Sequence, residues 1–320
     1  MTMRFDGLAG DMLTAGITSF GGPVTTLELP APRAPRAGEV LIEVHACGVG
    51  NWDEIVRNGG WDIGVQPPMA LGVQAAGVVS ACGEDVHFTA GDRVITHQAP
   101  VPEQGTWASH FIARAAAVAQ APAEVSMAEA GALPVPALTA DQALTDGVGI
   151  SPGQSIVIAG AGGVTGGLLV ALAVHYGARV FATASRASAD RVRSLGAHAV
   201  LDYHQPEWPA RIRDMTGGGV DAAVNAARAG AQTAMHAVRD GGRLATITGD
   251  APEIGRGISV AEVVVTPDGD RLARMTTLAA LGKLTITVGR RYRLDQAAEA
   301  LAQVVAGSGN GAVVITPATS

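Results

Sequence analysis

The sequence predicts an α/β protein that combines a doubly wound parallel sheet with a second domain rich in β-strands. Short β-like runs separated by Gly and Pro fill the first third of the chain. From about residue 155 to 265, apolar strands alternate with helices, which is the pattern of a parallel sheet with helical crossovers. A chain of 320 residues is also long enough for two domains.

The β-rich domain is predicted from apolar runs at close spacing. Val40–Val44, Ala75–Ser80 and Arg93–Thr96 have the composition of strands. Turn residues separate them at Gly83 and at Gly91–Asp92. We expect these strands to form a compact, mostly antiparallel domain.

The parallel sheet is predicted from the alternating segment. Its expected strands lie at residues 155–159, 179–184, 199–202, 220–225, 243–248 and 260–265. Its expected helices lie at residues 165–176, 188–195, 207–215 and 231–239. Gly177 and Gly196 follow the first two helices, at positions where a left-handed residue commonly ends a helix. The crossovers should be right-handed.

The C-terminal tail has no place in a six-stranded sheet. It is expected to contain helices at 272–281 and 294–305 and strands at 285–288 and 312–316. We expect the tail to return to the β-rich domain, which would leave a cleft between the two domains. The predicted domains are therefore residues 1–137 with 266–320, and residues 138–265.

Composition and charge exclude several classes of protein. A content of 48% hydrophobic and 16% charged residues describes a globular chain. The net charge of −7 and the lack of a Lys or Arg run argue against a nucleic-acid partner. Two cysteines, Cys47 and Cys82, cannot form a disulfide framework, so a reducing compartment is expected.

We expect neither a targeting segment nor a membrane span. Residues 1–16 carry two aspartates and lack the continuous apolar run of a signal peptide. The longest apolar stretch, Gly166–Ala184, contains His175 and Arg179, so it is interpreted as helix, turn and strand. The expected location is the cytoplasm.

A glycine-rich turn joins the first strand of the parallel sheet to its first helix. The segment is Gly160-Ala161-Gly162-Gly163-Val164-Thr165-Gly166. Glycines at 160, 163 and 166 permit a tight turn, the approach of a pyrophosphate, and close packing of helix on strand. The helix N-terminus adds N–H groups and partial positive charge. Such a turn can serve packing alone, but its position in a βαβ series favours dinucleotide binding.

The end of the second strand indicates which dinucleotide binds. NAD enzymes usually carry Asp or Glu there to hold the ribose 2′-hydroxyl. This chain instead has Thr183-Ala184-Ser185-Arg186. Ser185 can donate a hydrogen bond and Arg186 can fork onto a 2′-phosphate. A solvated arginine at a helix start is the plainer interpretation, but the missing acid and the present base favour NADPH.

Several short motifs occur in the order of a known family. They are Gly91-Asp92-Arg93-Val94, Leu138-Thr139-Ala140, Gly177-Ala178-Arg179-Val180, Ser194-Leu195-Gly196-Ala197 and Gly241-Gly242-Arg243. Together with the glycine turn, they resemble the medium-chain dehydrogenase/reductase superfamily in its zinc-free quinone oxidoreductase (zeta-crystallin-like) branch. The resemblance extends from about residue 14 to about residue 316.

The resemblance implies a GroES-like catalytic domain and a Rossmann domain. It implies a homodimer formed through the last sheet strand, here Val260–Val265. It also implies Tyr203 as a second contact to the 2′-phosphate, with a surface aromatic as the alternative, and it places Thr139 near the nicotinamide. The remaining predicted cofactor contacts are Asn225, Thr246, Ile247 and Thr248.

The zinc-ligand pattern of the superfamily is missing. Zinc alcohol dehydrogenases carry Cys in the loop that matches residues 47–53 and Gly-His-Glu where this chain has Gly72-Val73-Gln74. Here the Cys position is Gly50, and the four-cysteine structural lobe is lacking because Cys82 stands alone. Cys47 is interpreted as a buried free thiol. We therefore expect no metal.

Oxidation of an alcohol needs a metal to stabilise the alkoxide, and none is expected here. Reduction of a quinone or an enone is easier without a metal, because the charge that the hydride brings is placed on a conjugated oxygen. Asn51, one position beyond the usual family Asn, is a candidate substrate contact. Gln74 could donate to a carbonyl oxygen. Asp53 matches a family position and is a candidate catalytic residue. The alternative is that it only braces its loop. Water is the expected proton source, with His97 and His110 as alternatives.

The predicted substrate pocket lies in the β-rich domain. Its candidate residues are Gly50, Trp52, Trp61 and Trp107. An aromatic wall could stack a flat quinone, and ordinary core packing is an equally good interpretation of these tryptophans.

The predicted function is NADPH-dependent reduction of a small-molecule quinone or an activated C=C bond. A second hypothesis is an enoyl-thioester reductase, which needs a basic patch for a carrier phosphate. The candidates for that patch are Arg57, Arg290, Arg291 and Arg293. A third hypothesis is a protein that binds NADPH without turnover. No nucleic-acid or membrane partner is expected.

Overall fold

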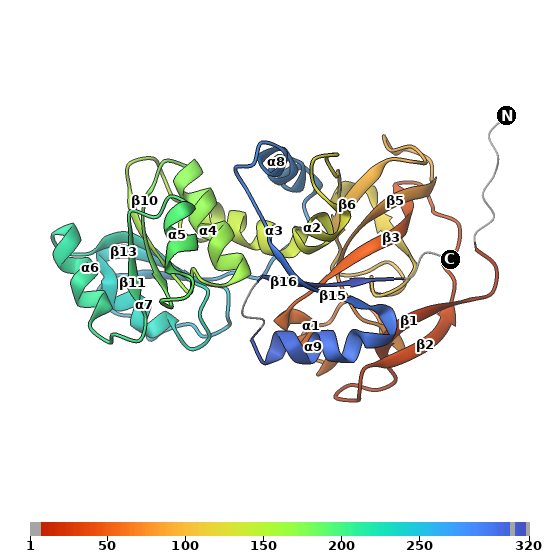
Figure 1. The fold of residues 1–320 in the computed structure, drawn as a ribbon, viewed down its shortest axis with the longest axis horizontal. Helices are drawn as coiled ribbons and strands as arrows, with labels where there is room; N and C mark the ends of the chain where they lie inside the picture. The colour runs from red at the N-terminus through yellow and green to blue at the C-terminus, as the bar shows by residue number, and fades with distance from the viewer. Residues whose placement is uncertain (1–7, 308–310, 318–320) are drawn as a thin grey trace. The chain divides into compact units, whose positions relative to one another are not determined.

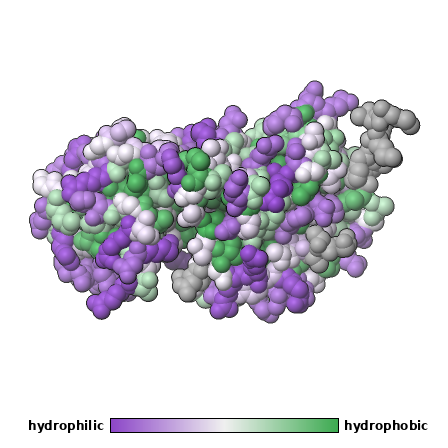
Figure 2. Space-filling view, turned by 45° about the horizontal axis from the view of Figure 1, so that its top comes forward, coloured by the Kyte–Doolittle hydropathy of each residue, from purple (hydrophilic) through white to green (hydrophobic). Residues whose placement is uncertain are grey.

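The computed structural model describes residues 8–307 and 311–317, and the chain divides into two compact units (Figure 1). The first unit comprises Met1–Val135, Pro267–Gly282 and Ile286–Ser320, and the second comprises Pro136–Thr266 with Lys283–Thr285. Hydrophilic and hydrophobic residues are interspersed over the face in Figure 2. Within the described part of the chain, no helix is long and apolar enough to cross a membrane.

The first unit is built on β-sheets. A seven-stranded sheet has the order β15-β16-β3-β5-β6-β8, with β7 also paired to β3. Its strands are β3 (Glu39–Val49), β5 (Gln74–Cys82), β6 (Arg93–His97), β7 (His110–Arg114), β8 (Val118–Gln120), β15 (Val288–Arg293) and β16 (Ala312–Thr316). A smaller sheet contains β2 (Thr25–Pro30), β1 (Asp11–Ile17) and β4 (Met69–Ala70). All of these pairings are antiparallel except that of β15 with β16, so the prediction of a mostly antiparallel β domain is confirmed.

Short helices connect the strands of the first unit. They are α1 (Asn51–Arg57), α2 (Met127–Ala132), α8 (Gly269–Ala280) and α9 (Ala297–Val305), with 3₁₀ turns at Ala115–Ala117 and Leu294–Gln296. Ser126 and Glu129 form a capping box at the start of α2, and the Asp268 side chain caps α8. These local signals fix where the helices begin.

The C-terminal tail returns to the first unit, as predicted, because β16 pairs with β3. The strand expected at residues 285–288 is wrong in position, since β15 spans Val288–Arg293. β15 is an edge strand, and its residues from Gly289 to Arg291 are exposed. It therefore lacks the alternation of apolar residues that a sequence pattern can detect.

The second unit contains a six-stranded parallel sheet in the order β11-β10-β9-β12-β13-β14. The strands are β9 (Ser155–Ala159), β10 (Arg179–Ala184), β11 (Ala199–Asp202), β12 (Val220–Asn225), β13 (Val238–Thr246) and β14 (Ser259–Glu262). The chain order along the sheet reverses between β9 and β12. This doubly wound topology, which was predicted, binds ligands outside the carboxyl ends of the strands at the reversal.

Helices accompany this sheet. They are α3 (Pro134–Gln142), a π-helical turn (Ala143–Gly147), α4 (Val164–His175), α5 (Ala189–Ser194), α6 (Trp208–Thr216) and α7 (Ala231–Ala237). Trp208 and Ile212 of α6 and Met235 of α7 share a buried cluster with Phe181 and Leu244 of the sheet. This apolar layer packs α6 and α7 against the sheet.

Two strands of the parallel sheet, β13 and β14, differ in extent from expectation. β13 begins at Val238 rather than at 243, because Gly241 and Gly242, which are typical of turns, lie inside the strand. β14 covers Ser259–Glu262 rather than 260–265. The apolar run continues beyond the ladder, and Val264 is 71% exposed.

Candidate cofactor and substrate sites

The glycine turn after β9 is tight on one side and open on the other. Gly160 has a φ of 81°, and a Cβ there would lie 2.9 Å from the backbone of Ala226. A Cβ on Gly166 would lie 2.1 Å from the carbonyl oxygen of Gly160, so glycine is required for α4 to pack this closely. A Cβ on Gly163 would meet only that oxygen, at 3.6 Å. The open side of the turn is therefore at Gly163.

Helix α4 begins at this open side without a competing anion. Gly163 is its N-cap, no side chain caps it, and its first turn contains no acidic residue. The first amides of the helix, from Val164, Thr165 and Gly166, have no carbonyl partner within the helix. Partial positive charge also accumulates there. The residues present therefore fit a pyrophosphate.

Ser185, Arg186 and Tyr203 follow the carboxyl ends of β10 and β11, which pair in parallel. The Oγ of Ser185 lies 2.9 Å from that of Ser188. Arg186 is exposed, and Tyr203 is 50% exposed with its ring against His204 at a centroid distance of 4.1 Å. This edge presents hydroxyls, a guanidinium and an aromatic ring, which are groups that suit a 2′-phosphate and its ribose.

Two charged residues at this edge were not predicted. Arg191 of α5 donates to the carbonyl oxygen of Gly162. Asp202 accepts hydrogen bonds from the backbone N–H of His204 at 3.0 Å and from its Nδ1 at 2.7 Å. These bonds lower the pKa of Asp202, as does the charge of Arg186. The position of Asp202 at the end of the strand beside β10 was the available signal.

Asn225, Thr246 and Thr248 meet at the carboxyl ends of β12 and β13. The Nδ2 of the fully buried Asn225 donates to the hydroxyl of Thr248 at 2.9 Å and to that of Thr246 at 3.2 Å. Sequence reasoning missed Asp250, which accepts from both threonine hydroxyls at 2.6 Å. The N–H of Ile247 donates to the carbonyl oxygen of Asn225 at 3.1 Å. The Asn225 side chain therefore holds this loop.

The predicted cofactor residues thus form two groups in the second unit. One contains the glycine turn with Ser185, Arg186 and Tyr203, and the other contains Asn225 with Thr246–Thr248. Thr139 lies in α3, where it is 9% exposed. Its predicted contact with the nicotinamide stays a prediction.

Asp53 is buried at the start of α1 in the first unit. Its Oδ2 accepts a hydrogen bond from the N–H of Gly50 at 2.8 Å, and its Oδ1 has no partner in the described residues. Burial raises the pKa of Asp53 to about 8, with partial opposition from the Gly50 hydrogen bond. This geometry favours the interpretation that Asp53 braces the loop. Asn51, at the first position of the helix, is exposed.

Gln74 is also engaged by the protein. It is 1% exposed, and its Oε1 accepts a hydrogen bond from the N–H of Val135 at 2.8 Å. Its Nε2 lies 2.2 Å from the point where a Cβ of Gly48 would be, so the small residue at 48 makes room for the amide. Gln74 therefore connects β5 to the first turn of α3.

The tryptophans of the first unit differ in environment. Trp107 is fully buried, so it belongs to the core rather than to an open aromatic wall. Trp52 and Trp61 are half-buried, and the Trp61 ring lies 6.3 Å from that of His97. Burial lowers the pKa of His97 to about 4, and its Nδ1 is hydrogen-bonded to the Val73 carbonyl oxygen at 2.9 Å. His97 is thus neutral at pH 7 and a poor proton donor.

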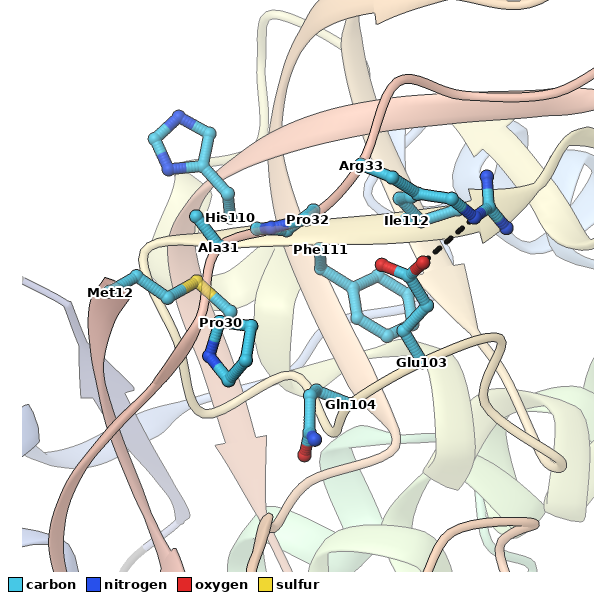
Figure 3. Close-up of a pocket in the computed structure, with 10 residues that line it drawn as sticks. All are labelled: Met12, Pro30, Ala31, Pro32, Arg33, Glu103, Gln104, His110, Phe111 and Ile112. Carbon is cyan, nitrogen blue, oxygen red and sulfur yellow. Dashed lines mark ion pairs between the residues drawn. The ribbon is translucent and has the colours of Figure 1, made fainter. Parts of the chain in front are cut away.

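A cavity of about 420 Å³ opens elsewhere in the first unit (Figure 3). Met12, Pro30 and Phe111 contribute apolar surface, and Arg33 forms an ion pair with Glu103 at 2.8 Å. His110, an alternative proton source, lines this cavity, whereas Asn51, Asp53, Gln74 and the four predicted pocket residues do not.

The described residues contain no group of three or more His, Cys, Asp or Glu side chains that could hold a metal ion. Cys47 is buried, and its thiol donates to the carbonyl oxygen of Thr106 at 2.8 Å. Burial raises the pKa of Cys47, and the neighbouring Asp53 raises it further. The expected lack of zinc stays a prediction.

Comparison with known proteins connects this geometry to a family. Residues 36–123 match the model of the alcohol dehydrogenase GroES-like domain, and residues 195–315 match that of the zinc-binding dehydrogenases. The chloroplastic quinone-oxidoreductase QR1 of Triphysaria versicolor is 29% identical over 97% of this chain and 100% of its own length. The polyketide synthase component PikAII of Streptomyces venezuelae is 30% identical over 94% of this chain but only 8% of its own length.

Solved structures agree in fold over nearly the whole chain. An NAD-dependent alcohol dehydrogenase has a TM-score of 0.86 and 27% identity, with 95% of this chain and 99% of that chain covered. A mycobacterial protein complexed with NADPH has a TM-score of 0.81 and 26% identity, with 97% and 100% covered. With its GroES-like β domain and its Rossmann sheet, the chain belongs to the medium-chain dehydrogenase/reductase superfamily, in the quinone oxidoreductase-like branch.

Proposed function

We propose that the protein is an NADPH-dependent reductase that delivers hydride to a quinone or to an activated C=C bond without zinc. The observation that carries the proposal is the edge formed by Ser185, Arg186 and Tyr203 beside an open glycine turn. A 2′-phosphate there would meet a guanidinium and hydroxyls. Asp202, the carboxylate at the end of the neighbouring strand β11, already accepts two hydrogen bonds from His204.

The residues of the second unit would bind and orient the cofactor. A nicotinamide dinucleotide, when bound, supplies the hydride. The amides at the start of α4 would hold the pyrophosphate, and Arg186 with Ser185 would hold the 2′-phosphate. The loop Thr246–Thr248 would line the nicotinamide half.

The first unit would supply the acceptor site. An acceptor oxygen gains negative charge as hydride arrives and needs hydrogen-bond donors. Of the three predicted catalytic residues, Asn51 is exposed, whereas Asp53 and Gln74 are buried and hydrogen-bonded to backbone amides. We therefore assign the direct contact to Asn51 and supporting roles to the other two. Water remains the proposed proton source.

The test is the oxidation of NADPH and of NADH, followed by absorbance, against a panel of quinones, enones and enoyl thioesters. We expect NADPH to be preferred and the rate to resist a metal chelator. Tight NADPH binding with no oxidation across the panel would contradict the reductase and favour a protein that binds NADPH without turnover.

Two observations favour an enoyl-thioester reductase as a second candidate. The first is the similarity to PikAII, a polyketide synthase component. The second is that Arg290 and Arg291 are exposed on the edge strand β15, and Arg291 lines a cavity of about 330 Å³ with His45. The other predicted basic residues are already paired, Arg57 with Glu54 at 2.7 Å and Arg293 with Asp295 at 2.7 Å.

The two candidates differ in how they treat a carrier phosphate. For a thioester reductase, Arg290→Ala with Arg291→Ala should raise KM for a phosphopantetheine thioester about tenfold and leave KM for a dephosphorylated thioester unchanged. Equal KM values for the two thioesters in the unaltered protein would exclude the phosphate contact and favour the quinone or enone acceptor.

We also propose a homodimer formed through β14. This strand is at the edge of the six-stranded sheet, so its outer backbone groups can pair with a second copy. The apolar side chains of Ile254 and Val264, on either side of the strand, are 80% and 71% exposed. Covering them would stabilise such a dimer.

A further inference from the structure

Asp250 is an unassigned carboxylate held tightly beside the loop Thr246–Thr248. It accepts hydrogen bonds from the hydroxyls of Thr246 and Thr248 at 2.6 Å, from the Nδ2 of Asn225 at 3.1 Å and from the N–H of Ala231 at 3.2 Å. The donors come from the ends of β12 and β13 and the start of α7. Asp250 is therefore fixed in one orientation by four donors.

The carboxylate carries a negative charge with no cationic side chain paired to it in the described part of the chain. Burial acts to raise the pKa of Asp250, but the hydrogen bonds from Thr246, Thr248 and Ala231 outweigh it, so the pKa is below its ordinary value. Among the residues that the structure describes, no Lys, Arg or His side chain forms an ion pair with Asp250. The Asp250 carboxylate, held at the carboxyl ends of β12 and β13, would therefore attract a cationic group of a ligand bound beside it.

The position of the carboxylate selects one part of the cofactor. Asn225 is opposite Ala159 of β9 on one side and opposite Thr246 of β13 on the other. The 2′-phosphate end of a dinucleotide belongs to the β10 side of the glycine turn, so its nicotinamide half lies over β12 and β13. Asp250 is on that half.

We propose that Asp250 sets the relative affinity of the protein for the oxidised and reduced forms of the nicotinamide cofactor. This inference rests on the proposed function. The nicotinamide ring is positively charged in NADP⁺ and neutral in NADPH, and the two forms differ by one hydride, which is two electrons and one proton. A nearby carboxylate stabilises the charged ring and leaves the neutral ring almost unaffected. Bound NADPH thus becomes a stronger hydride donor to the acceptor carbon or oxygen.

The direct test compares the Kd values of NADP⁺ and NADPH for the unaltered protein and for Asp250→Asn, by calorimetric or fluorescence titration. We expect the substitution to weaken NADP⁺ relative to NADPH by about three- to tenfold. A tenfold change in this ratio corresponds to about 30 mV in the potential of the bound two-electron couple. The matched control is Asp214→Asn, which removes a charge from an exposed position on α6 of the same unit and should leave the ratio unchanged.

A nicotinamide-free fragment, 2′-phospho-ADP-ribose, distinguishes the effect of the Asp250 charge on the nicotinamide ring from damage to the structure of the loop. Its Kd should be the same for the unaltered protein and for Asp250→Asn. If Asp250→Asn does not fold, Asp250→Glu and Asp250→Gln form a second pair that differs only in charge, and the ratio should differ between them by the same factor. An unchanged ratio, or an equal loss of both cofactor forms and of the fragment, would overturn the proposal. Failure of the unaltered protein to bind either cofactor form would instead contradict the proposed function.

Discussion

In the proposed cofactor site, Arg186 is the cation that would contact the 2′-phosphate and so distinguish NADPH from NADH. Its guanidinium is exposed after β10, and a charged hydrogen bond of this kind contributes about 1.5–3 kcal/mol. Arg186→Ala should therefore raise the Kd of NADPH roughly ten- to a hundredfold while changing that of NADH little. The control is Arg193→Ala, which removes an exposed arginine paired with Asp190 on α5. Equal losses for NADPH and NADH would show that Arg186 does not contact the 2′-phosphate.

Asp53 gives the stability of the protein a pH dependence. Burial raises its pKa from 3.8 to about 8, so the folded state binds a proton more tightly than the unfolded state does. The contribution of Asp53 to the free energy of unfolding should then be greatest below about pH 4. It should fall as the pH rises toward 8, by up to about 1.4 kcal/mol per pH unit.

Asp53→Asn removes the titrating group, so we expect it to flatten this dependence. The measurement is the free energy of unfolding in urea at several pH values between about 5 and 8. Glu124→Gln, at an exposed acid of the same unit, should keep the slope of the unaltered protein. The same slope in Asp53→Asn would mean that Asp53 is ionised in the folded state.

The site residues that the sequence predicts are those with a local signal. The glycine turn and the Ser185-Arg186 pair are each read from consecutive residues at a strand end. Asp250 was missed because its donors include Asn225, 25 residues earlier in the chain. The partner of Gln74 is the backbone of Val135, 61 residues away, and nothing in the local pattern indicates it.

At the scale of elements, two glycines at the junction of β9 with α4 have different roles. Gly166 is required for packing, and Gly163 is the glycine that the proposed pyrophosphate site needs. Gly166→Ala would force a Cβ to within 2.1 Å of the Gly160 carbonyl oxygen, and overpacking of this kind costs about 1–3 kcal/mol or more. Gly163→Ala has room for its Cβ and should cost about 1 kcal/mol or less, through the weaker N-cap.

Cofactor affinity should change in the opposite order. The Cβ of Gly163→Ala would point into the space that the pyrophosphate needs, so we expect the Kd of NADPH to rise about tenfold. Thermal unfolding and cofactor titration of the two variants provide the comparison. A Gly163→Ala protein that binds NADPH as well as the unaltered chain would place the pyrophosphate elsewhere.

Elements were predicted well where burial imposes a pattern. β9, β10 and β12 are apolar runs inside a sheet covered on both faces, and their predicted bounds match the structure. β15 is a polar edge strand, and β13 contains two glycines near its start, so neither has the pattern of a buried strand. Their extents are set by pairing with β16 and β12, which are tertiary contacts.

For the whole molecule, the sequence predicted a doubly wound parallel sheet and a tail that returns to the β-rich domain, whereas the strand order and the pairing of β16 with β3 come from the structure. Six strands complete the parallel sheet and leave the tail without a partner there. Few chain topologies satisfy both conditions. The assembly is less constrained, because an edge strand and exposed apolar residues allow a partner without specifying its geometry.

The proposed dimer makes a prediction at this scale. Val264→Asp would place a charge beside β14, where the dimer would bury it without a counter-ion, so we expect the protein to become monomeric at micromolar concentration. Sedimentation velocity or light scattering measures the change. Leu281→Asp is the matched control, since it alters a side chain that is 64% exposed in the first unit and should leave the dimer intact. Monomers of the unaltered protein, or dimers of both variants, would show that β14 is not the interface, and the exposed Ile254 and Val264 would then need another explanation.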